Sequence, residues 1–128
     1  MHYASIAAFS ASHDGKLICL STVLGVLYVY ETVARKLRKI PTGSRITCVT
    51  PSSPVSWLCG SKEGHVYKLE IDGGGVPSLS RVLTTQASVV QIAHYPQQKQ
   101  ILVLARSSVS VFHNERFYQQ IKTDDGAL

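Results

Sequence analysis

Three adjacent residues, Ser12, His13 and Asp14, are of the types that form the catalytic triad of a serine hydrolase. A triad requires the hydroxyl, the imidazole and the carboxylate to converge in space. Neighbouring side chains of a strand or a turn point apart, so three consecutive residues cannot reach that geometry. Gly15 follows Asp14, and the Asp-Gly dipeptide is typical of a β-hairpin turn. The segment therefore indicates a turn between two strands.

The other side chains that could do chemistry are scattered along the chain. The 5 histidines do not show the spacing of a metal site, and no cluster of carboxylates accompanies them. Residues 72–75 are rich in glycine, but neither a helix nor a Lys-Ser/Thr pair follows them to hold a phosphate. We therefore expect no catalytic residues, no metal ligands and no cofactor, and we predict that the chain is not an enzyme.

The cysteines favour a reducing compartment. Cys19, Cys48 and Cys59 are odd in number, lie in apolar segments and contain no C-x-x-C pair. We expect buried free thiols and a cytoplasmic protein. The amino-terminal residues do not show a signal-peptide pattern, and no apolar run approaches the roughly 18 residues that span a bilayer.

One short run carries most of the excess positive charge. The formal net charge is +5, and four positive charges come from Arg35, Lys36, Arg38 and Lys39. The run fits an outer edge strand that charge keeps soluble. It could also contact acidic protein, anionic lipid or RNA phosphate. A short amphipathic helix is a further alternative, because residues 33, 37 and 40 would share one helical face.

A repeat organises the rest of the chain. Three times, a turn residue is followed five positions later by a large apolar or aromatic residue. The pairs are Gly25 and Tyr30, Gly64 and Leu69, and Ser107 and Phe112. The steps between the three turn residues are 39 and 43. A period of about 40 residues with strand-like contents is typical of a β-propeller blade.

Each repeat contains four strand candidates separated by turns. The units are predicted at about 5–40, 45–83 and 89–121, and residues 122–128 are a polar tail. Within the second unit we expect strands at 45–50, 56–60, 65–71 and 79–83, with a turn at 51–54. Within the third unit we expect a turn at 95–98. A β-sandwich would also show many short strands, but it does not explain three units in the same order.

These residues resemble the WD40 family of β-propellers over about residues 5–121. The first unit, from Ile6 through Asp14-Gly15 to Glu31, follows the family pattern most closely. The Trp-Asp pair that closes the third strand in that family is replaced by Tyr30-Glu31, Leu69-Glu70 and Phe112-His113. The resemblance implies an all-β fold of three four-stranded antiparallel blades, which form an incomplete ring.

Three blades cannot close a propeller, which typically has four to eight. We therefore expect two bare blade faces with Ile, Val, Leu and Tyr side chains, a mark of an interaction site. Other polypeptide, further blades of the same or another chain, or a second copy in a homodimer would cover them. Trp57, Tyr67 and Phe112 are predicted core residues, whereas Tyr3 and Tyr118 are predicted to face a partner.

The resemblance implies a non-catalytic protein-interaction scaffold within a larger assembly. The assembly would be of the intraflagellar-transport, vesicle-coat or tethering, or nucleoporin type, in the cytoplasm at a cilium, an endomembrane or the nuclear pore. The alternative is a module that binds nucleic acid or anionic lipid through residues 35–39. The sequence does not specify the partner, the assembly or the total number of blades.

Overall fold

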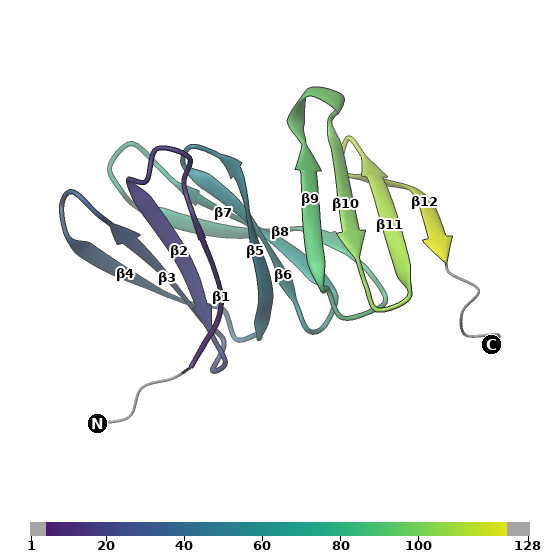
Figure 1. Cartoon of the computed structure of the whole chain (residues 1–128), viewed down its shortest axis with the longest axis horizontal. Coiled ribbons are helices and arrows are strands. Elements are labelled where there is room, and N and C mark those ends of the chain that lie inside the picture. Colours follow the sequence, from purple (N-terminus) through teal and green to yellow (C-terminus); the bar gives the residue numbers. More distant parts are fainter. Residues whose placement is uncertain (1–4, 123–128) are drawn as a thin grey trace.

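The computed structural model describes residues 5–122, and apart from one short 3₁₀ helix its regular structure consists of β-strands. The strands form three four-stranded antiparallel sheets, each built from four consecutive strands. We call these sheets blade 1, blade 2 and blade 3. They stand in a row with blade 2 in the middle (Figure 1). No helix within the described range is long and apolar enough to cross a membrane.

The strands follow the chain in simple order. Blade 1 contains β1 (Ile6–Ala11), β2 (Leu17–Thr22), β3 (Val26–Glu31) and β4 (Lys36–Pro41). Blade 2 contains β5 (Ile46–Ser53), β6 (Ser56–Ser61), β7 (His65–Ile71) and β8 (Pro77–Thr84). Blade 3 contains β9 (Gln91–Tyr95), the 3₁₀ helix η1 (Pro96–Gln98), β10 (Gln100–Leu104), β11 (Ser108–His113) and β12 (Arg116–Lys122).

The four-strand order of each predicted unit is confirmed, but three local expectations are wrong. The amphipathic helix considered around residues 33–40 is the strand β4. The turn expected at 51–54 is shorter, because β5 continues to Ser53. Strand β8 begins at Pro77, two residues before the expected start. The turn expected at 95–98 is present as η1, which is followed by Lys99 in a left-handed conformation.

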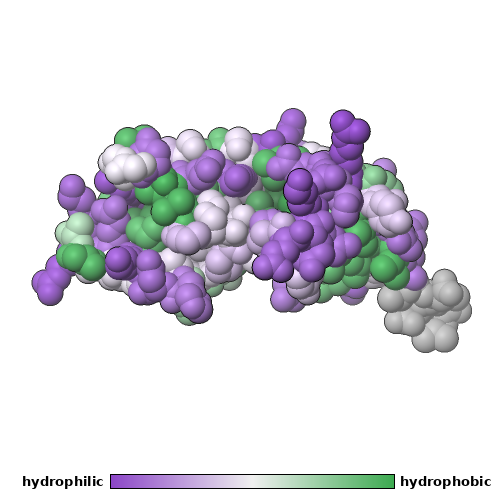
Figure 2. All heavy atoms as spheres, turned by 90° about the horizontal axis from the view of Figure 1, so that it is seen from above, coloured by the Kyte–Doolittle hydropathy of each residue, from purple (hydrophilic) through white to green (hydrophobic). Residues whose placement is uncertain are grey.

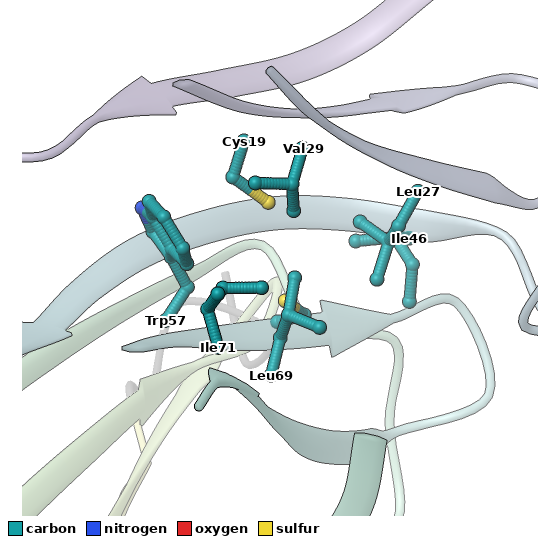
Figure 3. Packing of buried hydrophobic residues seen from close by; sticks show 8 residues of the cluster. Cys19, Leu27, Val29, Ile46, Trp57, Leu69 and Ile71 are labelled. Atoms are coloured by element: carbon teal, nitrogen blue, oxygen red, sulfur yellow. The ribbon is translucent and has the colours of Figure 1, made fainter. Parts of the chain in front are cut away.

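The first apolar core lies between blades 1 and 2, and we call it joint core 1. From blade 1 it takes Cys19, Leu27 and Val29, which share one face of β2 and β3 because side chains alternate along a strand. Side chains of blade 2 meet them from the other side, with Trp57, Leu69 and Ile71 (Figure 3). Trp57 is completely buried, as the sequence predicted.

The second apolar core lies between blades 2 and 3 and repeats this arrangement. We call it joint core 2. Its buried members are Leu58, Val66, Leu83, Val89, Ile92, Ile101, Val103 and Phe112. Val89 precedes strand β9, so the linker between the blades contributes to the core. Blade 2 is therefore buried on both faces, whereas blades 1 and 3 are each buried on one.

Each linker between blades is fixed to a glycine turn by a threonine. Thr42 donates its backbone N–H to the Gly25 carbonyl at 3.2 Å, and its hydroxyl lies 2.7 Å from the same oxygen. Thr85 repeats both contacts with the Gly64 carbonyl, at 2.7 and 3.1 Å. We call these pairs threonine–glycine clasps. No pattern in the sequence predicted them.

The two clasp glycines cannot be replaced without strain. Gly25 has φ +81 and Gly64 has φ +95, a left-handed region that favours glycine. A Cβ at Gly25 would lie 2.9 Å from the Ser44 carbonyl oxygen. A Cβ at Gly64 would meet the carbonyl oxygens of Thr85 and Ala87. The turns after β2 and β6 therefore approach the next linker too closely for a side chain.

Side-chain hydroxyls add hydrogen bonds between successive blades near their first strands. Ser21 donates from blade 1 to the Ile46 carbonyl of blade 2 at 3.1 Å. Thr50 donates from β5 to the Ile92 carbonyl of β9 at 3.0 Å, and Thr47 donates to the Val89 carbonyl. The first strands also contact one another, β1 with β5 and β5 with β9. The blades therefore join along their first strands.

We predict that Gly64→Ala destabilises the chain much more than Gly43→Ala. Gly43 also has a positive φ of +71, but a Cβ there would meet nothing within 4 Å. Gly43→Ala should therefore lower the free energy of unfolding by about 1–2 kcal/mol, the cost of the left-handed conformation. Gly64→Ala should cost more than about 3 kcal/mol, because backbone atoms must also shift.

Urea unfolding of the full chain and both variants, followed by tryptophan fluorescence, measures the difference. Equal losses for the two substitutions would show that the close approach of Gly64 to the linker does not matter.

Candidate protein-interaction site

The Ser12–Asp14 segment is a turn, as predicted. The Ser12 hydroxyl donates to Asp14 Oδ1 at 2.7 Å and accepts the Leu17 N–H at 3.0 Å. Asp14 also accepts the Lys16 N–H at 3.0 Å. The Lys16 N–H and then the Ser12 hydroxyl lower the pKa of Asp14. The hydroxyl and the carboxylate therefore lock the hairpin between β1 and β2.

The glycine-rich loop is a second closed turn. The Asp72 carboxylate accepts the N–H of Gly74 at 2.8 Å and the N–H of Val76 at 2.9 Å. Gly75 donates its N–H to the Asp72 carbonyl at 2.9 Å. Three of the N–H groups that a phosphate would need are therefore used within the turn.

His65, His94 and His113 lie at or next to the ends of strands β7, β9 and β11. His94 is half-buried at the side of a hollow that is also lined by Lys99, Asn114 and Glu115. Burial, and then the nearby Lys68, lower the pKa of His94, so its imidazole is neutral at pH 7. Within residues 5–122, no group of three His, Cys, Asp or Glu side chains is placed to hold a metal ion.

The three cysteines are free thiols packed in the sheets. Cys19 and Cys59 are completely buried in joint core 1, and Cys48 is partly buried against joint core 2. The Cys19 thiol, followed by burial, raises the pKa of Cys59 well above its usual value. Burial also raises the pKa of Cys48. Both thiols therefore stay protonated and unreactive at neutral pH.

Strand alternation divides the basic run between two faces and a turn. Arg35 lies in the turn before β4 with φ 55. Lys36 and Arg38 share a face with Ile40, which packs against joint core 1, whereas Lys39 lies on the opposite face. Arg38 approaches Glu31 at 4.0 Å and also reaches the backbone at Gly75. The four charges therefore do not form one surface.

The large residue that lies five positions after each turn residue shows which face of blade 1 is open. Leu69 points toward blade 1 in joint core 1, and Phe112 points toward blade 2 in joint core 2. The matching residue of blade 1 is Tyr30, on the face opposite to Leu27 and Val29. This face of blade 1 corresponds to the faces that blades 2 and 3 bury against a preceding blade.

We call this surface the blade 1 open face. Cross-strand partners place apolar side chains from all four strands on it. They are Phe9, Ile18, Leu20, Tyr28, Tyr30 and Leu37. Phe9 is 70% exposed and Leu37 is 60% exposed, and the others are half-buried by their neighbours on the sheet. A contiguous apolar sheet face of this kind marks an interaction site.

Blade 3 carries a second surface, which we call the blade 3 open face. It lies opposite to the residues that blade 3 buries in joint core 2. Its members are Ala93, Leu102, Leu104, Val109, Val111 and Ile121. Figure 2 shows apolar patches toward both ends of the stack. The structure thus has two apolar faces at opposite ends of three packed blades.

Of the two tyrosines predicted to face a partner, Tyr118 lies within the described residues and Tyr3 does not. Tyr118 lies on β12 and is 71% exposed, with its ring 6.3 Å from the ring of His113. It stands where the pairing of β11 with β12 is irregular. Tyr3 lies outside the described residues, as does nearly all of the predicted tail 122–128.

No protein-family model matches this chain, and neither does any curated protein sequence. Solved structures do match it in fold. The chain superposes on the WD40 repeats of RRP9 with a TM-score of 0.78 and 14% identity, covering 98% of this chain and 41% of that one. Superposition on a structure of U3-55K gives a TM-score of 0.77 and 14% identity, and covers 96% of this chain and 41% of that chain.

Superposition on a chain in the crystal structure of the mitotic checkpoint complex gives a TM-score of 0.76 and 14% identity, and covers 91% of this chain and 38% of that chain. The chain therefore spans about two fifths of the length of these structures. At this identity the likeness establishes the fold alone. The fold class is confirmed: three four-stranded antiparallel blades of a WD40-like β-propeller, without a closed ring among the described residues.

We predict that the buried thiols make the chain less stable at alkaline pH. In the unfolded chain a thiol ionises near pH 8.5, whereas the raised pKa values of Cys48 and Cys59 keep them protonated in the fold. Below that pH both states hold the protons, so the thiols add no pH dependence. Above it the unfolded state loses protons first, and the free energy of unfolding falls.

Urea unfolding from about pH 7 to about pH 10 tests this dependence. Cys59→Ala should be less stable at neutral pH but should lose less stability as the pH rises. An unchanged pH slope in this variant would contradict the assignment. Comparing slopes cancels the common contribution of the lysines and tyrosines.

Proposed function

We propose that this chain is a non-catalytic protein-interaction segment of a β-propeller, and that other polypeptide packs on its two open faces. One observation carries the proposal. The blade 1 open face corresponds to the face of blade 2 that blade 1 covers and to the face of blade 3 that blade 2 covers. Leu69 is completely buried by blade 1 and Phe112 is 5% exposed beside blade 2, whereas no blade among the described residues covers Tyr30.

The two surfaces suit a blade as their occupant. In joint core 1, small side chains of blade 1, such as Cys19 and Val29, receive the larger Trp57 and Leu69 of blade 2. The blade 3 open face likewise presents Ala93, and the blade 1 open face presents large side chains. A partner that repeats the four-stranded sheet would satisfy both surfaces.

A second copy of this chain is a less suitable partner than further blades. The three blades superpose on WD40 structures and cover about two fifths of the length of those chains. Such a ring requires about four more blades, whereas a second copy supplies three. We therefore favour a ring completed by further blades of the same or another chain over a six-bladed homodimer.

The binding of nucleic acid or anionic lipid by residues 35–39 has less support. A phosphate-binding strip needs cations that converge, and β4 places Lys36 and Lys39 on opposite faces. Arg38 reaches into the joint toward Glu31. Lys36 and Arg38 lie on the face of β4 opposite to the blade 1 open face, and Lys39 lies on the open face beside Tyr28. A place in a transport, coat or pore assembly in the cytoplasm is part of the proposal and follows only from the resemblance.

We predict that charges on the blade 1 open face abolish association without unfolding the chain. Leu20→Glu and Tyr30→Glu would each put a carboxylate into an apolar contact, which is costly when unpaired. Val33→Glu is the matched control, because Val33 is 82% exposed in the turn between β3 and β4. Light scattering after size-exclusion chromatography measures association, and circular dichroism measures melting.

The wild type should associate with itself or with co-expressed blades, and raised salt should not weaken this association. Leu20→Glu and Tyr30→Glu should be monomeric with nearly unchanged melting, and Val33→Glu should behave as wild type. A wild-type chain that is a cooperatively melting monomer, alone and with added blades, would refute the proposal.

A further inference from the structure

The outer edges of the three blades are formed by β4, β8 and β12. An edge strand offers unpaired N–H and C=O groups to another strand, and proteins usually protect it with Lys, Arg or Pro. Strand β4 carries three basic residues and ends in Pro41. Strand β8 begins with Pro77 and carries Arg81 in its middle. The edges of blades 1 and 2 are thus protected.

Strand β12 lacks this protection. Its basic residues, Arg116 and Lys122, stand only at its two ends, and it contains no proline. Between them, Phe117 is 61% exposed, Tyr118 is 71% exposed and Ile121 is 52% exposed. Exposed aromatic side chains along an unpaired edge are typical of a binding strand rather than of a protected rim.

A hollow lies next to this edge on the side facing blade 2. It has a volume of about 280 Å³. Phe112 and Phe117 line it with their rings 5.8 Å apart, edge to face. Hydroxyl and amide groups complete the lining, from Thr84, Thr85, Gln86, Ser110 and Gln120. An apolar side chain that enters the hollow would pack against this pair of rings, and neutral polar groups would surround it.

We propose that β12 accepts an extended peptide of a partner protein by β-strand addition, with an apolar centre and acidic residues at both ends. Main-chain hydrogen bonds to the open edge supply affinity, and a pocket for alternate side chains supplies specificity. Every second side chain of the added strand would point toward the hollow beside Phe117. Carboxylates at its ends would meet Arg116 and Lys122, because β12 itself carries no acidic residue.

The backbone edge of β12 is distinct from the open faces of the proposed function, although the Ile121 side chain also lies on the blade 3 open face. The fourth strand of a sheet stays at the outer edge whether or not another blade covers the sheet face. Peptide binding at β12 and the packing of blades on the faces can therefore succeed or fail independently.

A synthetic peptide as long as β12 tests the proposal, with Glu at both ends and alternating Val and Thr between them. Fluorescence anisotropy with the full chain measures its affinity, and amide hydrogen exchange locates it. We expect saturable binding and slower exchange in residues 116–122. The same peptide with alternate backbone nitrogens methylated on its pairing edge should not bind, because it cannot form the ladder.

Two matched comparisons test the protein side. Phe117→Ala should weaken binding by about tenfold, whereas Val76→Ala should not change it. Val76 is a suitable control, because it is 57% exposed and directly precedes β8, the fourth strand of blade 2. The N–H groups of adjacent strand residues point to opposite edges, so of Gln119→Pro and Gln120→Pro, one removes an N–H that pairs with β11 and the other removes an N–H on the open outer edge. The second variant should keep the wild-type melting temperature, and we expect it to lose peptide binding.

Three results would each overturn the proposal. The first is no saturable binding by a chain that melts cooperatively. The second is equal binding of the methylated peptide. The third is undiminished binding by the folded proline variant. None of them depends on the association state, so the proposed function would stand or fall separately.

Discussion

Apolar side chains from two successive blades meet in each joint core, and this burial between sheets is the interaction on which the rest of the structure depends. A four-stranded sheet of this length has two apolar faces and cannot bury either one by itself. Trp57 and Leu69 become inaccessible only because blade 1 lies over them. Stability therefore resides between the sheets, and each end of the stack must remain open until something covers it.

The blade architecture could be predicted from the sequence because its signals are local. Gly25 and Gly64 mark turns at which the chain adopts a left-handed conformation, and Leu69 and Phe112 follow at the distance that places them in a joint. The error at β5 also has a local cause. Pro51 looked like part of a turn, but it pairs with Trp57 beside a bulge, where a strand tolerates proline.

The candidate site depended on information that the sequence did not show. The bare faces were expected, but their members follow from strand register, and an irregularity between Ile6 and Ala8 shifts that register in blade 1. The threonine–glycine clasps span 17 residues in one linker and 21 in the other, so no fixed spacing marks them. The basic run looked continuous in sequence, whereas strand alternation separates Lys36 from Lys39.

The clasps also have a consequence for the order in which the chain can assemble during synthesis. Thr42 fixes the entry to blade 2 using only the turn at Gly25, and Thr85 fixes the entry to blade 3 using only the turn at Gly64. Each contact is available as soon as the linker has left the ribosome, before the next sheet exists. A nascent chain can therefore hold each new linker against the preceding turn while the joint core that stabilises both blades is still incomplete, and contacts of short sequence separation favour rapid folding.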